Sequence, residues 1–218
     1  MPSYYPVYLD LKERYCLVIG GGYEAERKVL GLLDCGAKVT VINTQISDVL
    51  GGLASRGVID WKARAYNIGD LEGFFLVVAE NDDLNLCKNV AMEAEERGVL
   101  LNVVDVTHLC NFIAPAIVRR GEVSFAISTG GLSPALARRL REELDESPIL
   151  RWAEMAEMIA EVRVQLRREG VRPDPERWQE CMDEQLLHMF HQGLEINAKE
   201  RLLVMLREQP TATRSLQE

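Results

Sequence analysis

The stretch Cys16-Leu-Val-Ile-Gly-Gly-Gly-Tyr-Glu-Ala25 decides the fold, because an apolar run leads through a glycine loop into a helix-compatible segment. Within it, Gly20, Gly22 and Ala25 fit the pattern G-x-G-x-x-A. The first glycine of this pattern allows a tight turn, the second lets the backbone approach a pyrophosphate, and the alanine lets helix and strand pack closely. We predict a dinucleotide site here, and a glycine turn that only packs is the alternative. The predicted cofactor residues of the loop are Gly20, Gly21, Gly22, Tyr23, Glu24 and Ala25.

The first hundred residues repeat this alternation of apolar runs and helix-compatible stretches. Continuous apolar runs suit strands that are buried on both faces. A rhythm of strand, helix and strand indicates crossover units and a parallel sheet. We therefore expect an α/β fold with a Rossmann-type doubly wound parallel sheet over residues 1–113. The runs are 16–19, 38–42, 74–78 and 99–104, and the helical stretches are 25–34 and 83–97.

The pattern changes near residue 114. Two β-rich stretches, 116–119 and 122–128, flank an Arg-Gly turn and predict a hairpin. Ser133 followed by Pro134 is typical of a helix start, with serine as cap and proline in the first helical position. We thus expect a small α+β region over 114–147 and an all-helical C-terminal region over 148–218.

The charge balance argues against nucleic acid as a partner. The 218 residues include 25 Lys and Arg against 34 Asp and Glu, a net charge of -9. Phosphate neutralisation by basic residues supplies most non-specific nucleic-acid affinity. One basic segment stands out nevertheless, because residues 117–141 hold five arginines against the single Glu122, a local net charge of +4.

The cysteines and the N-terminal sequence favour a cytoplasmic protein. The five cysteines include no C-x-x-C pair, and the start has no basic region followed by an apolar stretch. Free thiols in a reducing compartment are the expectation. No run approaches the ~18 to 20 apolar residues that a membrane span needs, so no membrane association is expected.

Two further segments are expected to face the cofactor. An acidic residue normally follows the second strand and binds the adenine ribose of NAD, but this chain has Asn43 there. Asparagine can still bond to ribose hydroxyls, and no Arg or Lys at 44–50 is present to pair with a 2′-phosphate, which favours NAD over NADP. For Asp82, capping of the following helix is an equal alternative. The additional cofactor candidates are Asn43, Thr44, Gln45, Asn81 and Asp82.

Asp105 is the candidate catalytic residue. It ends an apolar strand at the edge of the sheet where ligands bind in this architecture. A partly desolvated carboxylate there is suited to act as a general acid or base. A turn or cap residue in the unit Asp105-Val-Thr is the structural alternative.

Several linked motifs stand in order between residues 5 and 145: Tyr5-Pro-Val-Tyr-Leu9, Gly20-Gly-Gly22, Ala25-Glu-Arg-Lys28, Asn102-Val-Val-Asp105, Phe112-Ile-Ala-Pro115 and Ser128-Thr-Gly-Gly-Leu-Ser-Pro134 with Ala137-Arg138. With them the sequence resembles the precorrin-2 dehydrogenase and sirohydrochlorin ferrochelatase family, of the sirohaem synthase N-terminal type without the methyltransferase domain. The resemblance implies oxidation of precorrin-2 to sirohydrochlorin with NAD, ferrous iron insertion as a second candidate activity, and methylation by another protein. It also implies an intertwined homodimer, with 114–147 as dimerisation region, and assigns the chemistry to Asp105.

The resemblance gives the basic segment a function, because precorrin-2 carries eight carboxylates. Arginines pair with carboxylates in bidentate fashion, and hydroxyls and open backbone amides bind the same anions. A solvated helix face is the alternative for the later arginines. The predicted substrate-binding residues are Arg119, Arg120, Ser128, Thr129, Gly130, Gly131, Ser133 and Arg138.

Some features leave the function open. His108 is a weak candidate for an iron ligand, and a turn residue is the more common use of such a histidine. Glu24 stands where many relatives carry a small apolar residue, and Glu80-Asn81 replaces a more usual threonine-containing turn. The alternative function is a non-catalytic module that binds NAD or tetrapyrrole and hands sirohydrochlorin to a separate chelatase.

Overall fold

The computed structural model describes residues 4–208, which form two compact units. The first unit contains the chain up to residue 114 together with 128–133, and the second contains 115–127 and the chain from 134 onward. The division into three domains at residues 113 and 147 stays a prediction.

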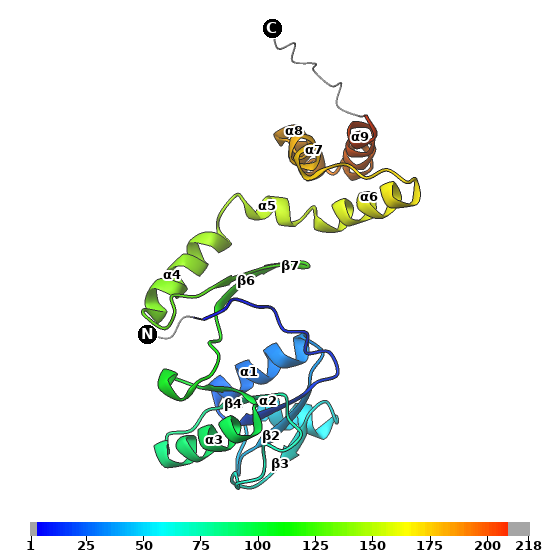
Figure 1. Cartoon of the computed structure of the whole chain (residues 1–218). Helices are drawn as coiled ribbons and strands as arrows, with labels where there is room; N and C mark the ends of the chain where they lie inside the picture. The colour runs from blue at the N-terminus through cyan, green and yellow to red at the C-terminus, as the bar shows by residue number, and fades with distance from the viewer. Residues whose placement is uncertain (1–3, 209–218) are drawn as a thin grey trace. The chain divides into compact units, whose positions relative to one another are not determined.

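The first unit is built on a five-stranded parallel sheet (Figure 1). Its strand order is β3-β2-β1-β4-β5, so the chain reverses direction across the sheet between β1 and β4. This is the doubly wound order of the Rossmann fold, which the sequence predicted. The strands are β1 (Tyr15–Ile19), β2 (Lys38–Ile42), β3 (Asp60–Lys62), β4 (Leu76–Ala79) and β5 (Leu100–Val103).

Helices cover both faces of this sheet, because the strands carry apolar side chains on both faces. Val18 and Val41 face one cluster with helices α1 (Tyr23–Asp34) and α2 (Asp48–Ser55). Their neighbours Leu17 and Ile42 face the other cluster, with α3 (Leu84–Arg97). The cap of α3 is Asp83, whose carboxylate accepts from the Asn85 amide at 2.8 Å. The capping role considered for Asp82 is therefore wrong, because the next residue, Asp83, is the cap.

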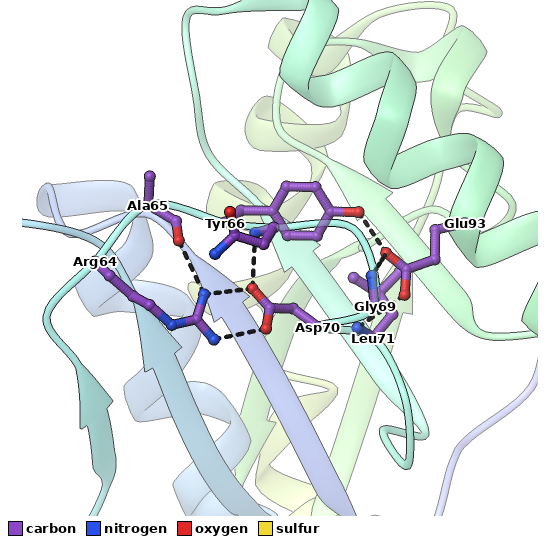
Figure 2. A network of polar contacts seen from close by, with 8 residues as sticks. Arg64, Ala65, Tyr66, Gly69, Asp70, Leu71 and Glu93 are labelled. Atoms are coloured by element: carbon purple, nitrogen blue, oxygen red, sulfur yellow. Dashed lines mark hydrogen bonds and ion pairs between the residues drawn. The ribbon is translucent and has the colours of Figure 1, made fainter.

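A buried carboxylate holds the long connection before β4 against α3. Glu93, on α3, is only 4% exposed. It accepts hydrogen bonds from the Tyr66 hydroxyl and from the amides of Gly69 and Leu71, the latter two at 3.0 and 3.1 Å (Figure 2). Arg97 donates a fourth bond, at 2.9 Å. Burial raises the pKa of Glu93, but these bonds outweigh it and hold the pKa below its ordinary value.

The second unit begins with the predicted hairpin, formed by the antiparallel strands β6 (Ala116–Arg120) and β7 (Val123–Ile127). Helix α4 starts at Pro134, as the sequence predicts, and contacts β6. Up to residue 208, where the description of the chain ends, five further helices make the all-helical region, with a core that includes Met155, Val162, Leu166 and Leu202. They are α5 (Leu150–Ala153), α6 (Ala156–Arg168), α7 (Pro175–Cys181), α8 (Glu184–His191) and α9 (Glu195–Arg207). Over residues 4–208, no helix has the length and apolar character that crossing a membrane requires.

Candidate functional site

The glycine loop joins β1 to α1 at the point where the strand order reverses. Three backbone hydrogen bonds fix it there. The Gly20 amide donates to the Ile42 carbonyl at 3.1 Å, and the Gly21 carbonyl accepts from the Ser47 amide at 2.9 Å. On the other side, the Glu80 amide donates to the Ile19 carbonyl at 2.7 Å. The loop therefore sits between the carboxyl ends of β2 and β4, which is where ligands bind in open parallel sheets.

The loop is packed so closely that two of its positions require glycine. Gly20 has a φ of +145°, a conformation that side chains rarely adopt. A Cβ at Gly21 would lie 2.1 Å from the carbonyl oxygen of Gln45, which is a clash with backbone. The glycines thus let the β1–α1 turn pass directly against its neighbours, in agreement with the first role assigned to the motif.

A carboxylate lies on the side of the loop where the phosphates of a dinucleotide would bind. Oε2 of Glu80 accepts a hydrogen bond from the Ala25 amide in the first turn of α1, at 3.1 Å. Both carboxylate oxygens also border Gly22, at 3.3 and 3.5 Å from where its Cβ would be. The backbone of this cradle fits a dinucleotide pyrophosphate, but one of its donor amides is engaged by Glu80. Glu24, in contrast, pairs with Arg27 at 2.7 Å.

The predicted cofactor residues after β2 and β4 follow the same edge. The Asn43 side chain donates to the Gln45 carbonyl at 2.8 Å and so shapes its own turn, while Thr44 is exposed. Asn81 likewise accepts from the Asp83 amide at 2.8 Å, and Asp82 is exposed. The structure therefore places all of them around the glycine loop, with the two asparagines partly engaged in local turns.

Asp105 lies two residues beyond β5 at the same edge of the sheet. Its φ of +60° is in the left-handed region, which aspartate tolerates better than most residues and which recurs at functional turns. The side chain is exposed, rather than partly desolvated as its position after an apolar strand predicted. A carboxylate on a tight turn at the ligand edge is free to meet a substrate.

Side chains hold the turn that carries Asp105. The Cys110 sulfur accepts from the Val103 amide at 3.1 Å, and the Asn111 side chain accepts from the Leu101 amide at 2.7 Å. Lys28, on α1, is a residue that the sequence reasoning missed as part of this site. Burial lowers the pKa of its ammonium group, and Asp105 is among the charges that oppose this shift. The motif Ala25-Glu-Arg-Lys28, which the sequence analysis noted, was the signal that could have identified Lys28 as part of the site.

The segment 128–133 belongs to the same unit and meets the Asp105 turn. A Cβ at Gly131 would lie 3.4 Å from Cγ2 of Thr107, in the short 3-10 helix η1 (Thr107–Leu109). Within the segment, the Thr129 hydroxyl accepts from the Ser133 amide at 3.2 Å, and the Gly130 amide donates to the Ser128 hydroxyl at 3.1 Å. Two segments predicted separately as catalytic and substrate-binding thus come together.

Two family models match this chain. Residues 7–116 match a family described as putative NAD(P)-binding, and residues 120–147 match one described as sirohaem biosynthesis protein, central. The chain belongs to this putative NAD(P)-binding family. It is 38% identical to the siroheme synthase of Methylococcus capsulatus over 92% of this chain and 43% of that protein. It is 40% identical to siroheme synthase 1 of Serratia proteamaculans over 76% of this chain and 35% of that protein.

The chain spans less than half the length of these curated relatives. A solved structure titled "SirC, precorrin-2 dehydrogenase" matches with a TM-score of 0.74 and 28% sequence identity. That match covers 93% of this chain and 98% of the other. The likeness therefore extends over nearly the whole of both chains.

The arginines that were predicted to bind the substrate lie in the second unit. Arg120 donates to the Asp145 carbonyl at 2.9 Å, and Arg138 pairs with Glu142 at 2.9 Å. Arg119 is exposed, and within residues 4–208 its guanidinium has no hydrogen-bond or ion-pair partner. Acidic residues just beyond the basic segment thus offset part of its +4 charge, and Arg119 is the arginine left open to an anion.

His108 lies in η1 and is exposed. In the described part of the chain, no group of three or more His, Cys, Asp or Glu side chains is arranged to hold a metal ion. His108 is therefore placed near Asp105 in sequence but without a ligand set around it.

Proposed function

We propose that this chain is a precorrin-2 dehydrogenase, which oxidises precorrin-2 to sirohydrochlorin with NAD. The observation that carries the proposal is the meeting of three elements at one edge of the sheet. The glycine loop, the exposed Asp105 and the segment 128–133 all belong to the first unit. The likeness to a solved precorrin-2 dehydrogenase over 93% of the chain supports the same function.

The chain's own residues supply positioning and a proton acceptor. Bound NAD would supply the hydride acceptor for the reaction. The loss of a hydride from carbon must be accompanied by the loss of a proton. Asp105 is exposed, and its carboxylate makes no hydrogen bond or ion pair among residues 4–208. Its carboxylate can therefore take that proton as a general base. The hydroxyls and amides of 128–131, with Ser133, would hold substrate carboxylates.

The residue after β2 supports NAD rather than NADP. Asn43 and Gln45 present amide groups, and none of residues 44–50 is Arg or Lys. A 2′-phosphate would find no cation here to pair with. We therefore expect a lower KM for NAD than for NADP.

The proposed assembly is a cytoplasmic homodimer. Three large apolar side chains of the hairpin and α4 stay exposed in the single chain: Ile117 at 49%, Leu136 at 49% and Leu140 at 42%. Apolar surface of this kind is often covered by a partner. The cysteines of the described chain are free thiols, as a reducing compartment would keep them.

The test is anaerobic turnover of precorrin-2 with NAD, followed by NADH absorbance. Asp105→Asn should lower kcat at least ~100-fold, the size typical of losing a general base. Asparagine accepts the left-handed backbone, so this variant should fold normally. Asp34→Asn is the matched control, because Asp34 is an exposed acid at the far end of α1. Full activity of Asp105→Asn would remove this residue from the mechanism.

Other outcomes address the alternatives. If the folded wild type binds NAD but shows no turnover, the protein is a binding module rather than a dehydrogenase. Ferrous iron added to sirohydrochlorin tests the second activity, and a rate equal to the protein-free control would exclude iron insertion. Charge reversal at Arg119, whose guanidinium is unpaired among residues 4–208, should raise the KM of the tetrapyrrole with little effect on NAD. Equal weakening of both would indicate a folding defect.

A further inference from the structure

The carboxylate of Glu80 is the one acidic group of the described chain that reaches into the glycine loop's amide cradle. It lies 3.1 Å from the Ala25 amide, and it borders both Gly20 and Gly22. Glu80 comes from the end of β4, 55 residues away along the chain from Ala25. The other acid of the loop, Glu24, is turned to Arg27 instead.

This position is the one that a dinucleotide phosphate would need. The second glycine of G-x-G-x-x-A leaves space for a pyrophosphate beside the backbone, and the free amides at the start of the helix bind its oxygens. Here the space beside Gly22 is bordered by Oε1 and Oε2 of Glu80, at 3.3 and 3.5 Å from the missing Cβ. A carboxylate and a phosphate compete for the same donor, and two negative charges within ~4–6 Å disfavour each other.

We infer that Glu80 is a built-in competitor of the cofactor phosphate and thereby sets the affinity of the chain for dinucleotides. The inference rests on the proposed function, since it assumes a dinucleotide at the glycine loop. In the free protein the carboxylate stabilises the N-terminus of α1, where negative charge is favourable. Binding of a dinucleotide requires this side chain to leave the Ala25 amide. Glu80 thus stabilises the free protein and weakens its binding of the cofactor.

The variants Glu80→Gln and Glu80→Ser separate the two effects. Glutamine keeps the shape and removes the charge, whereas serine also empties the cradle. Glu96→Gln is the matched control, because it removes an exposed acid near the C-terminal end of α3, at the opposite edge of the sheet. Isothermal titration of the full chain measures binding directly. The probes are NAD, ADP-ribose and adenosine, the last of which has no phosphate.

Both Glu80 variants should bind NAD and ADP-ribose at least ~10-fold more tightly than wild type, equivalent to ~1.4 kcal/mol. Adenosine affinity should change less than twofold, and Glu96→Gln should match wild type. Glu80→Ser should also lower the Tm of the free protein while increasing the rise in Tm that saturating NAD produces.

Three results would overturn the inference. One is unchanged or weaker NAD binding in both Glu80 variants, and another is equal tightening of adenosine, which would remove phosphate competition as the cause. In either case wild-type NAD binding leaves the proposed function standing. The third is absence of NAD binding by the wild type and by both variants, which would overturn the proposed function as well.

Discussion

Removal of the Glu93 carboxylate should destabilise the first unit more than any exposed substitution on α3. Four donors converge on this side chain, and the Leu71 amide among them belongs to a fully buried residue. Glu93→Ala leaves that amide without a partner. The Gly69 amide and the Tyr66 hydroxyl lose the same acceptor, but their hydrogen bonds are only partly buried. Arg97, 35% exposed, can turn to water.

The expected cost follows from these differences in exposure. A buried donor that loses its partner costs ~1–3 kcal/mol, and breaking a buried charged contact costs ~3–5 kcal/mol in total. We expect Glu93→Ala to lower the free energy of unfolding by roughly 3–5 kcal/mol, a large share of the ~5–15 kcal/mol of an ordinary domain. Glu93→Gln, which keeps one acceptor oxygen, should cost about half as much.

The assay must report the first unit by itself, because the chain has two compact units. Hydrogen exchange pulses across a urea series, read on peptides from β1, β4 and β5, give the unfolding midpoint of the sheet. Glu95→Ala is the control, since Glu95 is exposed two residues further along the same helix. A difference of less than ~1 kcal/mol between Glu93→Ala and Glu95→Ala would refute the reasoning, because surface changes stay within ~0.5 kcal/mol.

The pH dependence of this contribution has a defined sign. The folded state holds the pKa of Glu93 below its ordinary value of 4.5. A carboxyl whose pKa is depressed on folding stabilises the protein above the unfolded pKa, and the stabilisation is lost as the pH falls through the folded pKa. The difference between wild type and Glu93→Gln should thus be constant from pH 7 to 5 and shrink below 4.5.

Three further results are expected. Gly21→Ala should abolish NAD binding in a titration and lower the Tm, because the added Cβ meets a backbone carbonyl at 2.1 Å; wild-type affinity would contradict the loop geometry. Asp183→Ala should lower the free energy of unfolding of the second unit, measured in urea, by ~1–3 kcal/mol. The reason is that Asp183 caps α8 and pairs with Arg201 at 2.6 Å. No change would show that the cap and the ion pair are dispensable. In the native protein at pH 8, DTNB should react rapidly with the exposed Cys35 but not with Cys16, because burial raises the pKa of the Cys16 thiol to about 11. Rapid labelling of Cys16 would mean that β1 opens readily.

Local patterns predicted the main elements of the first unit but not all of them. The runs that became β1, β2, β4 and β5 are long and apolar enough to be recognised. Strand β3 is three residues long and exposed, and α2 contains the pair Gly51-Gly52, which lowers helix propensity. Both were missed because packing against neighbours, rather than their own sequence, stabilises them.

The site divides in the same way. The glycine loop and the position of Asp105 follow from the order of strands and loops, and sequence placed both at the ligand edge. Whether Asp105 is buried, and which aspartate caps α3, depends on the exact path of the turns, and there the sequence predictions were wrong.

By itself, the sequence determined the parallel sheet, the glycine loop between β1 and α1, and the likeness to sirohaem biosynthesis proteins, because each rests on residues close together in the chain. Only the tertiary structure decided what fills the cradle of that loop. Glu80 reaches the Ala25 amide across 55 residues, because the sheet places β4 next to β1. Glu93 finds three of its four partners 22 to 27 residues away, in the connection before β4 that packs against α3. Strand order determines the partner of Glu80, and the packing of the connection before β4 against α3 determines the distant partners of Glu93.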